Sequence, residues 1–159
     1  MKKILVLATM FFTCHANASL VVGDLVQYQM TVSTAAYSQV MQEKIEVTAI
    51  NPSQGTYTSN ITVTFNGMQI SQSSVNSNLN SAEVDETTVG RCSQISGATI
   101  ETITVSAGSF KVCHISNQQG DVKYDYFMGS VLFGLVKSVT MDSASGTTTT
   151  LELIQYIKH

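Results

Sequence analysis

The chain has 159 residues, with 8 basic and 11 acidic side chains and a formal net charge of −3. After the first three positions the basic residues are scattered, so the sequence lacks the concentrated positive surface that nucleic acids or anionic membranes require. Its length suits one domain that can bury a core of its own.

The first 18 residues predict a secretory signal peptide. Lys2 and Lys3 precede an apolar run over residues 4–12, and Ala16-Asn-Ala18 provides a cleavage site. The apolar run is shorter than the roughly 20 residues of a membrane span. We therefore expect an exported domain over residues 19–159, periplasmic or extracellular, with 6 basic and 11 acidic residues and no transmembrane segment. Lipidation of Cys14 is an alternative that would anchor the protein.

Cleavage at this site leaves two cysteines, Cys92 and Cys113. Exported cysteines most often pair, because that compartment is oxidising. The rival interpretation is a reactive thiol beside His114. Neighbouring residues on a strand point to opposite faces, so this interpretation is the weaker one.

Alternating apolar and polar residues predict strands in the first half of the chain, at 24–32, 43–50 and 57–65. Asn66-Gly67 predicts a tight hairpin, with a return strand beginning at 68. Residues 33–38 read as a loop and 51–55 as a turn. The polar stretch 71–81 also reads as a loop, followed by a weak helical turn at 81–86, and residues 71–98 together could cover a cavity or form a surface excursion.

The second half predicts a hairpin over 99–115, with its turn at 106–109. Further strands follow, at 122–127, 135–141 and 149–157, with a glycine-bracketed bend at 129–134. Eight or nine short strands joined by tight turns indicate an all-β fold with at most one short helix. A strongly curved antiparallel sheet or partial barrel is our first expectation, and a β-sandwich is the alternative.

No stretch carries a known catalytic or phosphate-binding motif, and we assign no catalytic residue, metal or cofactor. His114 reads as a packed, hydrogen-bonded histidine rather than a ligand or base. Glu101, Asp125 and Glu152 are the carboxylates that could pair for acid–base chemistry, although isolated acids on strands usually face solvent. A buried serine or carboxylate beside His114 would favour a hydrolase.

The segment Glu101–Phe110 (ETITVSAGSF) resembles the E-T-V-x-V-x-A-G-x-F hairpin of a group of uncharacterised exported bacterial proteins. The first strand at 22–28, the Phe-Gly-Leu-Val-Lys segment at 133–137 and the threonine-rich closing strand are similar too, so the resemblance covers nearly the whole exported domain. The chain departs from the group where a tryptophan is expected, carrying Tyr126-Phe127 instead. More distantly, a curved sheet is similar to the half-barrels of periplasmic lipoprotein carriers, which hold acyl chains.

Two functions compete on this basis. The first is a non-catalytic binding or carrier module for an apolar small molecule or lipid. Its expected lining is Tyr57, Ile61, Val63, Phe65 and Phe110. The second is a structural or protein-interaction domain with an envelope protein as its partner and no small-molecule site. An open apolar concavity would favour the first function, and a filled interior the second.

Overall fold

In a computed structural model of the protein, residues 20–79 and 89–159 are described. The predicted signal peptide (1–18), the Cys14 alternative and the helical turn at 81–86 lie outside these residues.

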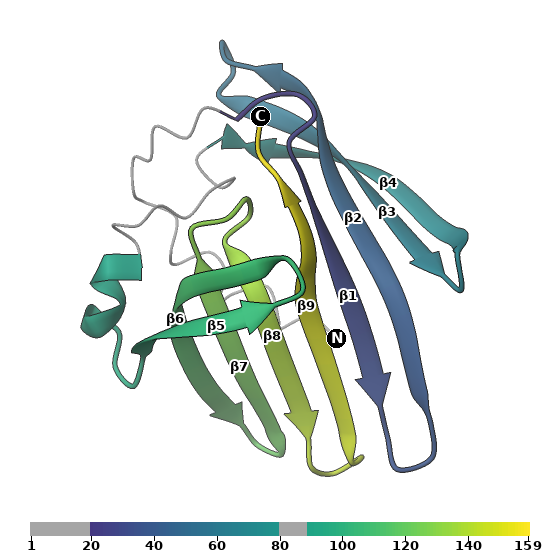
Figure 1. The fold of residues 1–159 in the computed structure, drawn as a ribbon, viewed down its shortest axis with the longest axis vertical. Helices are drawn as coiled ribbons and strands as arrows, with labels where there is room; N and C mark the ends of the chain where they lie inside the picture. The colour runs from purple at the N-terminus through teal and green to yellow at the C-terminus, as the bar shows by residue number, and fades with distance from the viewer. Residues whose placement is uncertain (1–19, 80–88) are drawn as a thin grey trace.

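The described residues form one open, nine-stranded antiparallel sheet with the order β4-β3-β2-β1-β9-β8-β7-β6-β5 (Figure 1). A short 3-10 helix, η4 (Arg91–Gln94), precedes β5. The prediction of a curved all-β sheet is confirmed, and the sandwich alternative is not found, because the strands belong to a single sheet. The strands are β1 (Leu25–Ser33), β2 (Ser38–Asn51), β3 (Thr56–Phe65), β4 (Met68–Asn78), β5 (Thr99–Val105), β6 (Gly108–Gln119), β7 (Val122–Gly129), β8 (Leu135–Asp142) and β9 (Thr147–Ile157).

Tight turns explain why most neighbours in the sequence are neighbours in the sheet. Asn66 and Gly67 both have positive φ, 50° and 76°, as a two-residue hairpin turn between right-twisted strands requires. Strands β5 and β6 are likewise joined through Ser106 and Ala107 alone. The exception is the pair β4 and β5, which follow each other in the sequence but form the two edges of the sheet. Conversely, β1 and β9 are far apart in the sequence but pair at the centre of the sheet.

The loop predicted for residues 71–81 is wrong over most of its length. Residues 71–78 belong to β4, which pairs with β3 from Met68 to Asn78. The polar composition misled the prediction because a strand is usually recognised by the apolar face that it buries. Strand β4 is an edge strand exposed over residues 68–76, and its backbone hydrogen bonds to β3 hold it without any buried face.

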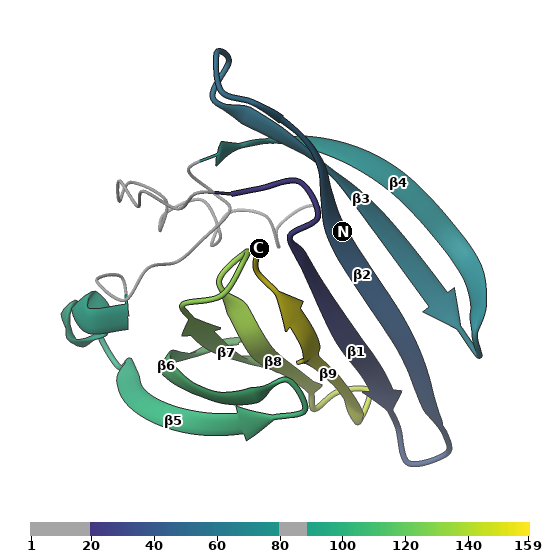
Figure 2. The same ribbon diagram turned by 45° about the horizontal axis from the view of Figure 1, so that its top comes forward.

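The sheet is strongly curved and packs on both of its faces. The β5–β6 hairpin folds across the sheet in front of β7 and β8 (Figures 1 and 2), and its tip is tied to β9 where the Ala107 amide donates to the Leu153 carbonyl at 3.3 Å. On the opposite face of the sheet, the ring centroids of Tyr57 in β3 and Phe133 in the β7–β8 loop lie 6.1 Å apart. This contact brings β3 close to the loop between β8 and β7, which are four and five positions away from β3 in the sheet.

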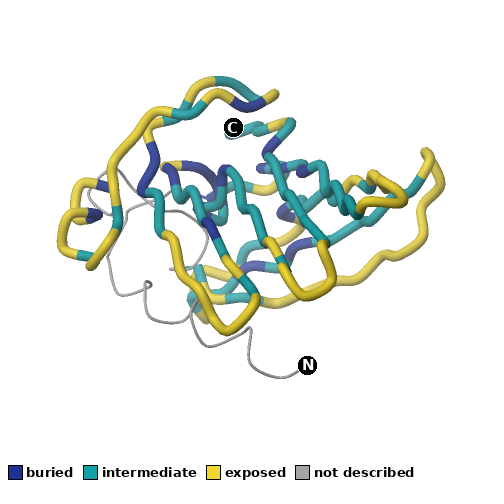
Figure 3. Tube along the Cα trace, turned by 90° about the horizontal axis from the view of Figure 1, so that it is seen from below, coloured by how far each residue is buried: buried dark blue, intermediate teal, exposed yellow. Residues whose placement is uncertain are grey.

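The hydrophobic core combines residues of the central strands with residues of the β7–β8 loop and the β5–β6 hairpin. Figure 3 shows that the buried stretches lie inside the molecule, while the hairpin ends are exposed. Packing is close around Gly129, because a Cβ atom there would lie 2.7 Å from Val136 Cγ2. The buried apolar side chains of this core are Leu20, Val26, Tyr28, Val47, Tyr57, Val105, Val112, Val131, Leu132, Val136 and Leu153.

One fully buried carboxylate joins the two ends of the described chain. Asp24 accepts hydrogen bonds from the Val21 and His159 amides at 3.0 and 2.8 Å and from Lys158 Nζ at 2.9 Å. Burial alone would raise the pKa of Asp24, but these donors outweigh it and hold the pKa below its usual value. The carboxylate therefore stays charged inside the protein at neutral pH.

Candidate functional site

A row of mostly apolar side chains crosses seven strands on one face of the sheet. Cα partners in neighbouring antiparallel strands point to the same face, so the register identifies the row without gaps. Every member of the row is half-buried. The row runs Ile115, Tyr126, Ser138, Leu151, Met30, Met41 and Phe65 from β6 to β3. We call the side of the sheet that carries it the apolar face.

The apolar face continues along β3 toward the core. Ile61 and Val63 alternate with polar residues and share the face of Phe65, and both are half-buried. Tyr57, further along the same face, is buried against Phe133. Four of the five residues predicted to line a ligand site therefore lie on one face. Tyr57 is buried, and the other three are half-buried.

Phe110 is separated from these four residues. It alternates with Val112 and His114 of β6, whereas Ile115 of the apolar row points to the other side of the same strand. Phe110 instead lines a partly open pocket of about 210 Å³ together with Val89, Ser109, Lys111 and Ser130. This pocket is distinct from the apolar face.

The opposite face of the sheet carries ion pairs. Lys137 Nζ lies 3.3 Å from Glu152 Oε2, and the two residues are Cα partners next to Ser138 and Leu151 of the apolar row. Lys44 and Glu46 of β2 also pair on that side, at 2.6 Å. Because adjacent strand residues alternate, these charges lie opposite the apolar row in the central strands, and this segregation does not extend to β6 and β7, where Val112 and Phe127 share the side of the ion pairs. We call the side of the sheet that carries the ion pairs the charged face.

Glu43 interrupts this segregation. Its Cα partners are Tyr28 in β1 and Val63 in β3, so its side chain points to the apolar face. It is half-buried, and that burial raises the pKa of its carboxyl group. Among the residues that the structure describes, no side chain or backbone group forms a hydrogen bond or ion pair with it.

A second group of polar residues surrounds His114 on the charged face. Its Nδ1 lies 3.0 Å from Glu101 Oε1 and its Nε2 lies 3.1 Å from Asp125 Oδ1, while its ring stacks on Phe127 with centroids 4.3 Å apart. Burial works to raise the pKa of Asp125, but hydrogen bonds from Lys123, Ser116 and His114 outweigh it and lower that pKa. The packed, hydrogen-bonded histidine expected from the sequence is what the structure contains.

The His114 cluster contains the buried carboxylate that would favour a hydrolase, yet its geometry does not suit one. Both ring nitrogens already face carboxylates, which leaves neither free to take a proton from a nucleophile. Ser116 bonds to Asp125 and not to His114, so the order of groups differs from a serine–histidine–acid triad. Glu152 takes no part here, because it contacts Lys137 and Ser106.

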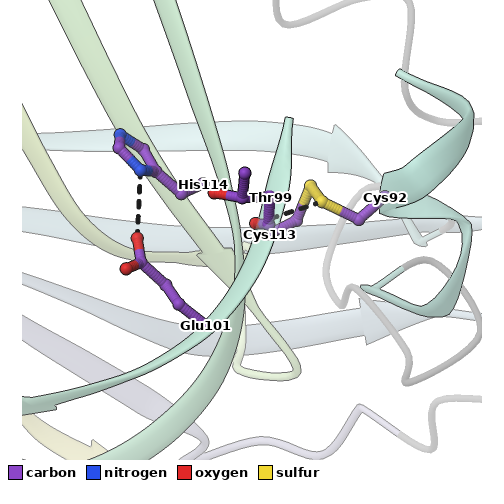
Figure 4. Close-up of a disulfide and its surroundings, with 5 residues drawn as sticks. All are labelled: Cys92, Thr99, Glu101, Cys113 and His114. Atoms are coloured by element: carbon purple, nitrogen blue, oxygen red, sulfur yellow. Dashed lines mark hydrogen bonds and ion pairs between the residues drawn. A yellow bond between two sulfur atoms is a disulfide. The ribbon is translucent and has the colours of Figure 1, made fainter. Parts of the chain in front are cut away.

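Cys92 and Cys113 form a disulfide that fastens η4 to β6 (Figure 4). Glu101 and His114 lie beside it but point away from the sulfur atoms (Figure 4). Both cysteines are buried. Because they form a disulfide, neither is the free thiol that a reactive cysteine beside His114 would require.

Sequence reasoning missed much of the apolar row. Met41 lies before the strand predicted at 43–50, and Met30 and Leu151 had no assigned role although both lie in predicted strands. Glu43 was missed as well. The alternation of apolar and polar residues in β1 was visible, but the pairing of β1 with β9 that aligns Met30 with Leu151 has no local signal.

Within residues 20–79 and 89–159, no three His, Cys, Asp or Glu side chains are grouped so that they could hold a metal ion. Nor does that part of the chain contain a helix long and apolar enough to cross a membrane.

Comparison with known proteins supports the fold. No family model and no curated protein matches the chain. A candidate exported protein with a YmcC-like fold from Bacteroides fragilis is similar in structure, with a TM-score of 0.53 and 12% identity over 87% of this chain and 97% of that one. Two structures of MucB are also similar, one with MucA(peri) and one of the Pseudomonas aeruginosa MucA/MucB complex. Both have TM-scores of 0.48, with 7% and 6% identity over 83% of this chain and 49% and 50% of those chains.

Proposed function

We propose that this protein is a non-catalytic binding module of the bacterial cell envelope, and that its apolar face binds an apolar small molecule or the acyl chain of a lipid. The proposed lining is Ile61, Val63 and Phe65 of β3, with Met30, Met41 and Leu151 added from the neighbouring strands. Tyr57 forms the buried end of this lining. Phe110 belongs to the separate pocket and is left out of it.

The apolar row is the observation that carries the proposal. Its seven strands span six gaps of about 4.8 Å, or about 29 Å in total, which accommodates an extended alkyl chain. Each methylene buried there would contribute up to about 0.8 kcal/mol before the costs of association. Contiguous apolar surface that is only half-buried is typical of ligand or partner sites.

The compartment is also part of the proposal. The signal peptide predicted at 1–18 directs export, and the Cys92–Cys113 disulfide suits an oxidising environment. Anchoring through Cys14 is the alternative to a freely diffusing protein. Periplasmic or extracellular location fits either case.

A protein-interaction domain is the second candidate, and strand β4 favours it. This edge strand contains no charged residue and no proline over Met68–Asn78, and the exposed fractions of Met68 and Ile70 are 67% and 57%. Edge strands without such protection are templates for pairing with an extended segment of another protein.

The first test is native mass spectrometry of protein expressed from the full sequence and purified from the envelope, before and after solvent extraction. A reproducible added mass that is lost on extraction is the expected result, and it would identify the class of ligand. Binding of the fluorescent apolar probe N-phenylnaphthylamine to the extracted protein provides the quantitative assay.

Two neighbouring substitutions in β1 make the test specific to the apolar face. Met30→Glu places a charge on that face and should weaken probe binding at least about tenfold. Thr31→Glu places the same charge on the opposite face and should leave binding unchanged. A bare mass together with no probe binding would overturn the carrier function and leave β4-mediated protein binding as the candidate to pursue.

A further inference from the structure

Glu43 is the one acidic residue of β2 that points away from the charged face. Strand β2 holds three charged side chains, and two of them, Lys44 and Glu46, pair with each other on that face. The side chains two positions away from Glu43 on its own face are Met41 and Ile45, and those across from it are Tyr28 and Val63. The carboxylate thus lies within apolar and aromatic surroundings.

Within residues 20–79 and 89–159, no neighbouring side chain compensates the Glu43 charge. Tyr28 uses its hydroxyl elsewhere, donating to the Leu135 carbonyl at 2.9 Å. The apolar row itself contains no lysine or arginine. A partly buried carboxylate that has lost some of its water gains most from a partner that brings a cation or a hydrogen-bond donor.

We propose that Glu43 determines the specificity of the apolar face, and that its ligand is an alkyl amphiphile whose cationic amine pairs with the Glu43 carboxylate. This inference rests on the proposed function. The alkyl chain would lie along the row beside Met41 and Phe65, with the amine held between β1 and β3. An anionic amphiphile of the same length would bring a like charge to Glu43 and would find no lysine or arginine in the row.

Competition against N-phenylnaphthylamine tests the inference with three compounds of equal chain length, used below their micelle concentrations: dodecylamine, dodecanol and dodecyl sulfate. The expected result for the unaltered protein is that dodecylamine binds about tenfold more tightly than dodecyl sulfate, with dodecanol between them. The preference should weaken as salt is added, because the pair is only half-buried.

Glu43→Gln should reduce the preference to less than about twofold while dodecanol binds as before. Glu46→Gln is the matched control on the same strand and should keep the full preference, because that residue lies on the charged face. A second variant protects the test against misfolding of the first. Val63→Lys places a cation across from Glu43, which should occupy the carboxylate and likewise abolish the preference.

The possible results distinguish the role of Glu43 from the proposed binding of an apolar ligand. If dodecanol binds but the amine has no advantage, or if the advantage persists in Glu43→Gln and Val63→Lys, the role of Glu43 is refuted and the apolar carrier stands. If none of the three compounds displaces the probe, the carrier function and this inference are both overturned.

Discussion

The buried carboxylate of Asp24 offers a sharp test of what holds the ends of the described chain together. Its two oxygens accept three hydrogen bonds, from Val21, Lys158 and His159, at 2.8 to 3.0 Å. Asp24→Asn keeps one carbonyl oxygen but turns an amide N–H toward donors. With the amide nitrogen in the place of Oδ2, the two bonds from Val21 and Lys158 are at risk, and each is worth about 1.5–3 kcal/mol because its acceptor is charged. Lys158 can turn to solvent, so we expect a loss of about 3 kcal/mol at neutral pH.

The pH dependence of this loss identifies charge as its cause. The pKa of Asp24 is lowered on folding, so its contribution is complete above the unfolded value of about 3.8 and disappears as the pH falls through the folded value. The difference in the free energy of unfolding between the parent protein and Asp24→Asn should therefore shrink in acid.

Urea unfolding followed by circular dichroism measures both quantities, at about pH 7 and in steps down to about pH 3. Asp121→Asn, which changes an exposed carboxylate, is the control and should stay within about 0.5 kcal/mol of the parent. A loss below about 1 kcal/mol at neutral pH, or a loss of constant size down to pH 3, would refute the reasoning.

Two further stability predictions follow from the core and the disulfide. Replacing both Cys92 and Cys113 by alanine should cost about 3 kcal/mol in urea unfolding, because the bond closes a loop between residues 21 positions apart; reductant should destabilise the parent and leave the double variant unchanged. Gly129→Ala should cost about 1–3 kcal/mol in thermal unfolding, because its Cβ would lie 2.7 Å from Val136 Cγ2. Gly90→Ala, which meets nothing within 4 Å, is the control, and an equal cost at both positions would contradict the packing argument.

The strands that bury one face could be read from the sequence, and those that bury none could not. Strand β3 alternates cleanly, and the φ values at Asn66 and Gly67 match the hairpin expected there. Strand β4 has no buried face, so the signal that identifies strands is missing, and only its pairing with β3 defines it.

The candidate site depends on register, which is a property of the whole sheet. Phe65 and Ile61 were predicted from the alternation within β3. Met30, Met41 and Leu151 join them only because β1 pairs with β9 on one side and β2 on the other. The convergence of Glu101 and Asp125 on His114 likewise requires three strands to align, so residue type alone could nominate these side chains without placing them together.

The pairing of β1 with β9 has a consequence for how the protein is made. Leu25 pairs with Ile157, so the backbone hydrogen bonds between β1 and β9 join segments from opposite ends of the described chain. The hairpins β1–β4 and β5–β8 can each form early, but they remain two separate pieces until residues 147–157 arrive between them. A chain exported from its first residue onward would thus complete its sheet only after nearly all of it has crossed the membrane. Until then, the edges of β1 and β8 have no partner strand, and we expect the docking of β9 to reduce their tendency to pair with other chains.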